Sequence, residues 1–178
     1  MIEDELLVVR CQLGERPAFD QLIQRWHGPL GIYVQRMTGD DQAAQDIVQD
    51  VWLSVLRGIG RLRDGSKLRA WLFGIARHRL MDWWREQYAT PILNDVDVTA
   101  IAAEDPPADL EAELKTMEHE LARLPVIERE ALTLFYLKEL SLAEVAEVLG
   151  IPVGTVKSRL FRARQWLRRE LEAKGRQA

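Results

Sequence analysis

The sequence predicts an all-α protein made of two small helical domains joined by an acidic linker. Apolar residues recur at three- and four-residue steps along nearly all of the 178 residues, and no run alternates with the two-residue period of a strand. Residues 89–109 break this pattern, because they hold three prolines and five acidic residues but no Lys or Arg. We therefore expect one domain over residues 1–88 and a second over 110–178.

The composition supports a folded protein and predicts a cytoplasmic location. Hydrophobic residues make up 47% of the chain, which is enough to form a core. The sequence shows neither a signal peptide nor an uncharged apolar run long enough for a membrane span. Cys11 has no partner for an internal disulfide, and we expect it to be an ordinary packed thiol, with a redox sensor as the alternative. No Cys and His spacing resembles a zinc site, and we expect no metal or other cofactor.

The periodicity predicts helices over residues 3–13, 17–27, 29–38, 42–58, 66–87, 109–123, 127–137, 142–149 and 153–173. Charge varies strongly along these elements. Acidic residues outnumber basic ones in residues 1–56 and 89–122, whereas basic residues prevail in 57–88 and 123–178. The two basic segments are either solvated helix faces or two surfaces for a polyanion.

The helix expected at 42–58 has two contrasting faces. Asp46, Gln49, Asp50 and Leu53 share one face, and Ile47, Val48, Val51 and Val55 fill the other. Carboxylates so close together suit a general acid and base or a metal, but no His or third ligand accompanies them here. The polar face is therefore interpreted as a docking strip for a protein.

The helix expected at 66–87 combines basic and aromatic residues. Its apolar stripe consists of Leu68, Leu72, Ile75, Ala76, Leu80 and Trp83, which places Trp83 in the core. Guanidinium groups that follow phosphates and rings that stack on bases are typical of single-stranded DNA binding. The candidate contacts are Arg69, Trp71, Arg77, His78, Arg79, Asp82, Trp84 and Arg85.

Residues 141–173 predict a helix-turn-helix. Ser141 and Glu144 form a capping box, and Gly150 and Pro152 supply the turn before a second helix. In that helix Val156, Leu160, Ala163 and Leu167 share an apolar face, and Lys157, Ser158, Phe161, Arg162 and Gln165 lie opposite. Such a basic outward face suits the major groove of duplex DNA. The alternative is a charged surface helix in an ordinary helical hairpin.

These motifs resemble those of the extracytoplasmic-function (ECF) sigma factors. Residues 124–171 are similar to the region 4 domain of that family, including the Pro152 to Arg159 stretch, which adds Thr155 and Arg159 to the candidate DNA contacts. Residues 17–59, with "QDIVQDVWL", resemble regions 2.1 and 2.2, and residues 67–87 resemble regions 2.3 and 2.4.

The resemblance implies a sigma factor with no catalytic residues of its own. Asp46, Gln49, Asp50 and Leu53 would bind core RNA polymerase. The first domain would melt and read the minus-ten promoter element, and the second would read the minus-thirty-five element. An anti-sigma factor is a further expected partner, and no membrane insertion is implied.

One candidate departs from the family pattern. His78 stands where the family usually has Asn in the pocket for a flipped minus-ten base, so its alternative is an exposed residue that only solvates the helix.

Two other classes of protein remain as alternatives. A conventional two-domain regulator would need a sensing domain in 1–88, which lacks an α/β pattern. A helical metal enzyme would need converging ligands, and His27, His78 and His119 are far apart in the sequence.

Overall fold

The computed structural model describes residues 2–88, 120–137 and 140–175. These stretches fold into helices joined by turns, and no strand occurs within them. The prediction of an all-α fold is therefore confirmed. The predicted linker at 89–109 and most of the helix predicted at 109–123 lie outside the described residues. The domain boundaries at 88 and 110 stay a prediction.

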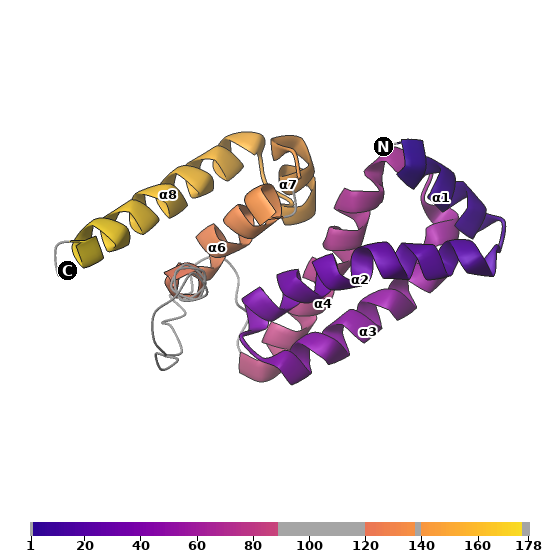
Figure 1. Cartoon of the computed structure of the whole chain (residues 1–178), viewed down its shortest axis with the longest axis horizontal. Helices are drawn as coiled ribbons and strands as arrows, with labels where there is room; N and C mark the ends of the chain where they lie inside the picture. Colours follow the sequence, from indigo (N-terminus) through magenta and orange to yellow (C-terminus); the bar gives the residue numbers. More distant parts are fainter. Residues whose placement is uncertain (1, 89–119, 138–139, 176–178) are drawn as a thin grey trace.

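Residues 2–88 form four α-helices around a shared apolar core (Figure 1). They are α1 (Ile2–Gln12), α2 (Arg16–Thr38), α3 (Asp41–Gly58) and α4 (Leu68–Tyr88). Two short 3-10 turns, Ile59–Arg61 and Gly65–Lys67, lead from α3 into α4. α3 packs against both α2 and α4, so residues on its outer face stay exposed.

α2 runs without interruption from Arg16 to Thr38, although the sequence predicts two helices that meet near residue 28. That prediction was wrong. Pro29 lies inside α2, where a proline removes one backbone donor and normally kinks or ends a helix. Trp26, Leu30 and Tyr33 on both sides of it are buried in the core. The packing of these three side chains in the core therefore outweighs the free-energy cost of a proline within the helix.

The turn between α2 and α3 is fixed by two local signals. Gly39 ends α2 in the left-handed conformation, with φ of 68°, and its backbone N–H donates to the Gln35 carbonyl. A residue without a Cβ adopts this φ at little cost. Asp40 then caps α3, because its side chain accepts hydrogen bonds from the backbone N–H groups of Gln42 and Ala43.

The C-terminal described residues form α6 (Val126–Leu132), a π-helical turn (Thr133–Leu137), α7 (Leu142–Leu149) and α8 (Val153–Gly175). The helices predicted at 127–137, 142–149 and 153–173 are thereby confirmed. α6 and α7 both pack against α8, which extends beyond them (Figure 1).

The two groups of helices touch each other. α7 packs along α4, and α6 contacts α2 (Figure 1). Within the described stretches, no helix has the length and apolar character needed to cross a membrane.

Candidate nucleic-acid interface

α7 and α8 form the predicted helix-turn-helix. The Ser141 side chain accepts a hydrogen bond from the Glu144 backbone N–H, and the Glu144 carboxylate accepts one from the Ser141 N–H, so the capping box is confirmed. Gly150 ends α7 in the left-handed conformation, with φ of 65°. A turn of three residues follows, and α8 packs against α7.

α8 separates its apolar and polar side chains as the sequence predicts. Val156, Leu160 and Ala163 are buried. Lys157, Ser158, Phe161 and Arg162 are exposed, and Phe161 keeps 60% of its surface accessible. A bulky ring left in water beside basic side chains has the character of a contact surface rather than of a packed face.

The other three candidates on α8 are only half-exposed. Thr155, Arg159 and Gln165 lie at the edge of the outward face. Burial lowers the pKa of the Arg159 guanidinium, and the carboxylates of Glu130 and Glu128 oppose this effect. Arg159 is therefore half-buried and close enough to the acids of α6 to feel their charge.

Two exposed side chains of α8 already have partners within the protein. The Ser158 hydroxyl donates to the backbone carbonyl of Gly154 over 3.0 Å. The Nε of Arg162 donates to Oε1 of Glu128 in α6 over 2.8 Å. The sequence analysis did not single out Glu128.

The predicted docking strip lies on the outer face of α3. Asp46, Gln49 and Asp50 are exposed, as is Leu53, with 43% of its surface accessible. The opposite face is buried, with Ile47, Val48, Val51 and Val55 in the core. Leu56, at 54% accessible, extends the strip by about one turn of helix. The predicted helical phase is confirmed, and the role of the strip stays a prediction.

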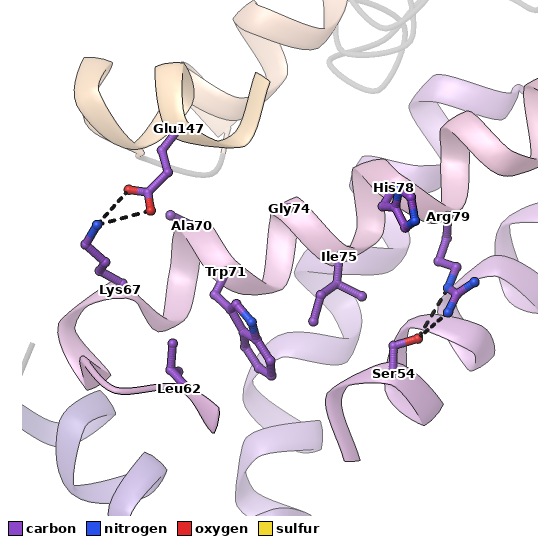
Figure 2. A pocket seen from close by; sticks show the side chains of 10 residues that line it. All are labelled: Ser54, Leu62, Lys67, Ala70, Trp71, Gly74, Ile75, His78, Arg79 and Glu147. Carbon is purple, nitrogen blue, oxygen red and sulfur yellow. Dashed lines mark hydrogen bonds and ion pairs between the residues drawn. The ribbon is translucent and has the colours of Figure 1, made fainter. Parts of the chain in front are cut away.

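α4 carries the mixed basic and aromatic surface. A cavity of about 400 Å³ runs along it, lined by Trp71, Gly74 and His78 of α4 together with Ser54 of α3 and Glu147 of α7. Figure 2 shows Trp71, Gly74 and His78 along α4, with Ser54 and Glu147 on the neighbouring helices. The His78 side chain is 69% exposed. The cavity therefore presents an aromatic ring and an imidazole to the solvent.

Trp71 is held in place by a close approach to α3. A Cβ added at Gly58 would come within 3.0 Å of the indole Cζ2. Such a distance is tighter than ordinary van der Waals contact, so the missing side chain of Gly58 leaves room for the ring.

Arg79 and Asp82 organise the next turn of α4. The Arg79 guanidinium donates from Nε and Nη2 to the Ser54 hydroxyl, over 3.2 and 2.9 Å (Figure 2). Asp82 pairs with Arg79 at 3.6 Å and lies 3.8 Å from the His78 imidazole. It also pairs closely with Arg85. His78, Asp82 and Arg85 thus share one face, as predicted.

The positions of the two adjacent tryptophans differ from the sequence prediction. Trp84 was expected to contact DNA and Trp83 to lie in the core, but Trp84 is only 9% exposed and Trp83 is half-buried at the edge of the core. Leu68, Leu72, Ala76, Leu80 and Trp84 follow one another at four-residue steps and form the buried row. Trp84 therefore belongs to the core, and the remaining candidates on this helix are half-exposed or exposed: Arg69, Trp71, Arg77, His78, Arg79, Asp82 and Arg85.

Two acids that approach α4 from the second group of helices were not predicted from the sequence. Glu130 of α6 is 4% exposed, and its Oε1 lies 3.3 Å from Nε of Arg77. The Tyr33 hydroxyl donates to the same oxygen over 2.8 Å. In the sequence, Glu130 lies between Ile127 and Leu134 on an otherwise apolar helix face. An acid at such a position indicates a buried carboxylate that has a partner.

A second ion pair joins the 3-10 turn that precedes α4 to α7. Nζ of Lys67 lies 3.2 Å from Oε1 of Glu147, and both side chains are about half-exposed (Figure 2). Two acids of the C-terminal helices thus lie against two basic residues, one in α4 and one in the 3-10 turn that leads into it.

The arrangement offers little for metal or thiol chemistry. No group of three or more His, Cys, Asp and Glu side chains converges within residues 2–88, 120–137 and 140–175. The His27 imidazole accepts a hydrogen bond from Trp52 Nε1 over 3.2 Å. Cys11 is buried, and burial raises the pKa of its thiol, which disfavours the reactive thiolate.

Comparison with known families identifies both halves of the chain. Residues 22–90 match the Sigma-70 region 2 model, and residues 114–167 match the model of Sigma-70, region 4. The RNA polymerase sigma-H factor of Pseudomonas aeruginosa is 35% identical, over 96% of this chain and 94% of its own length. The ECF RNA polymerase sigma factor SigM of Mycobacterium tuberculosis is 36% identical, over 94% of this chain and 84% of its own length.

Solved structures give the same result. CnrH, in complex with the cytosolic domain of CnrY, superposes with a TM-score of 0.71 at 26% identity and covers 96% of this chain and 97% of its own. The sigma factor RpoE of Bartonella quintana, in complex with the anti-sigma factor NepR, has a TM-score of 0.68 at 26% identity and covers 86% of this chain and 96% of its own.

Proposed function

Because this chain belongs to the ECF RNA polymerase sigma factors and directs promoter-specific transcription initiation, we propose how its surfaces divide that task. The exposed strip of Asp46, Gln49, Asp50 and Leu53 on α3 binds core RNA polymerase. Its polar residues provide charge complementarity, and Leu53 at the end of the strip provides a small apolar contact.

The outward face of α8 reads the minus-thirty-five element. The observation that carries this assignment is the coexistence of the capped turn with four exposed residues, Lys157, Ser158, Phe161 and Arg162, above a buried apolar row. Lys and Arg pair with guanine edges in the major groove, and an aromatic ring contacts a thymine methyl. Thr155, Arg159 and Gln165, at the edge of this face, contact the flanking backbone.

The exposed side of α4 takes up the melted minus-ten strand. Arg69, Arg77, Arg79 and Arg85 follow its phosphates, while Trp71 stacks on an unpaired base. His78 and Asp82 supply hydrogen-bonding groups beside the cavity. Trp84 is excluded from this role by its burial.

The remaining assignments follow from the same family. The protein acts in the cytoplasm and performs no catalytic step, since the polymerase carries out the chemistry. CnrH was solved in complex with CnrY, and RpoE in complex with the anti-sigma factor NepR. The similarity of this chain to both supports an anti-sigma factor as a regulatory partner.

Reconstitution with core RNA polymerase tests the proposal. The wild-type chain should bind the core enzyme and support transcription from a subset of a promoter library. Asp50→Lys should weaken core binding about 30-fold or more, because reversing a charge in a complementary interface costs several kcal/mol. Asp20→Lys, a matched reversal on the exposed surface of α2, should bind like wild type. A chain that selects promoters equally well without polymerase would instead be a conventional regulator.

A further inference from the structure

Arg162 is the one α8 candidate that the described residues show in an ion pair with a side chain of another helix. Its Nε donates to Oε1 of Glu128, which lies in the first turn of α6, over 2.8 Å. The carboxylate is largely enclosed, with 13% of its side chain exposed, whereas the Arg162 side chain is 57% exposed. The Glu128 carboxylate is therefore enclosed within the domain, whereas the Arg162 guanidinium that it binds lies at the surface.

The hydrogen bond to Glu128 is made by Nε of the guanidinium. A guanidinium has five N–H donors in a rigid plane, and the two terminal nitrogens form the fork that pairs with O6 and N7 of guanine. Within the described part of the chain, the hydrogen bond of Arg162 to a protein side chain is made by Nε, and neither Nη donates one. Arg123 differs, because its Nη1 itself lies 3.4 Å from both Glu120 and Glu170.

We propose that Glu128 is a specificity-determining positioning residue, which holds Arg162 from behind so that its terminal fork faces one base pair of the upstream promoter element. This inference rests on the proposed role of Arg162 in base reading and adds a residue that touches no DNA.

The physical gain comes from side-chain entropy and geometry. A free arginine samples many rotamers and loses much of this conformational freedom when it is fixed. A carboxylate that has already fixed Nε lowers this cost at the moment of binding and also sets the plane of the fork. A loosely held arginine would instead reach phosphates and several bases about equally well.

The same carboxylate has an opposing effect on affinity. A negative charge near the duplex repels phosphates, whatever the sequence. Removing Glu128 should therefore reduce discrimination at one base pair while leaving overall duplex affinity unchanged or higher. A residue that served only to stabilise the fold would not separate these two readouts.

The test uses holoenzyme reconstituted from core RNA polymerase and the full chain, on promoters varied at every position of the upstream element. Arg162→Ala identifies the base pair that this residue reads. Glu128→Ala should lower discrimination at that same base pair about three- to thirtyfold, comparable to restoring part of the rotamer freedom of an arginine. Combining both substitutions should give the profile of Arg162→Ala alone, because the two residues act as one unit.

Three further variants make the result decisive. Glu128→Gln keeps an oxygen that accepts from Nε, so it should retain most of the discrimination while losing the repulsion. Glu128→Leu removes the acceptor but fills the enclosed site, and it replaces Glu128→Ala if helical content or thermal midpoint shows that the smaller residue disrupts the fold. Glu170→Ala, which breaks a different Glu–Arg pair of the same domain, should leave the base profile unchanged.

The possible failures differ from one another. If Arg162→Ala relaxes one base pair but Glu128→Ala and Glu128→Leu change none, Glu128 has no positioning role and the proposed reading face still stands. If these variants raise affinity equally for all sequences and leave discrimination intact, Glu128 acts only through its charge. If Arg162→Ala itself changes no base preference, the proposed reading role of Arg162 fails and the inference fails with it.

Discussion

Tyr33 of α2 and Glu130 of α6 are joined by a 2.8 Å hydrogen bond from the phenol to the carboxylate, and both side chains are buried. Arg77 of α4 pairs with the same carboxylate oxygen at 3.3 Å. A buried carboxylate is costly unless it is paired and hydrogen-bonded. These contacts therefore fasten three helices from the two groups at one point.

Replacing Glu130 with Ala should lower the free energy of unfolding by about 3–5 kcal/mol, because it leaves the Arg77 guanidinium and the Tyr33 hydroxyl without their buried acceptor. Urea denaturation followed by circular dichroism measures the change. Glu147→Ala breaks the exposed pair with Lys67 and should cost no more than about 1 kcal/mol. Similar losses for the two variants would contradict a special role of the buried contact.

Tyr33 should make the protein sensitive to alkaline pH. Burial, followed by the neighbouring Glu130 carboxylate, raises the pKa of its phenol well above the usual value of about 10. In the unfolded chain the phenol ionises above about pH 10 while the folded form stays protonated, so ionisation favours unfolding. This contribution is complete below about pH 10 and is lost as the pH rises toward the folded-state pKa.

Comparing wild type with Tyr33→Phe isolates this effect from other alkaline titrations. Between about pH 9 and about pH 11, the wild type should lose more stability than the variant, as measured by denaturant unfolding. A stability difference that stays constant with pH would show that Tyr33 does not titrate differently in the two states.

Arginines at different positions on α8 should have different effects on DNA. Arg162→Ala should cost about 1–3 kcal/mol at one base pair of the upstream element and relax selection there. Arg168, exposed farther along the helix, should contact phosphate, so that Arg168→Ala weakens all sequences about equally and reduces the salt dependence. Binding of holoenzyme to promoter variants at several salt concentrations measures both effects. A purely salt-dependent effect of Arg162→Ala would remove it from the reading face.

His78→Asn should change base choice at one position of the minus-ten element. The exposed imidazole lines the cavity beside Trp71, and an amide presents a different set of donors and acceptors there. Open-complex formation on promoters varied at each minus-ten position provides the measurement. A uniform loss on every promoter would assign His78 to solvation of the helix surface, the alternative that the sequence left open.

The elements governed by local patterns were predictable from the sequence. The capping box at Ser141, the left-handed Gly150 and the exposed face of α3 depend on residues within a few positions of each other, and the structure contains all three. Continuity of α2 was not predictable, since the local penalty of Pro29 is visible in the sequence while the packing that offsets it is not.

The tryptophan assignment failed because of helical phase. Trp83 and Trp84 are adjacent, so a small error in the phase of the stripe, accumulated over the turns from Leu68, exchanges the buried ring for the exposed one. For the contacts between the two groups of helices, the sequence shows that Glu130 lies on an apolar helix face, but it does not show the partners of Glu130, for a different reason. Tyr33 and Glu130 are 97 residues apart in the chain, and nothing local announces their contact.

Where α6 and α7 contact α4, carboxylates of the protein pair with basic side chains in the way that DNA phosphates do. Glu130 and Glu147 present carboxylates to Arg77 and Lys67, as a strand would present phosphates, and a side chain engaged with one is withheld from the other. If α4 takes up the melted strand as proposed, the C-terminal helices compete with that strand for the same basic side chains. The apparent affinity for the strand would then equal the intrinsic affinity multiplied by the fraction of molecules in which the two groups of helices have separated. A polymerase that holds the groups apart would strengthen strand capture without adding any contact to the DNA.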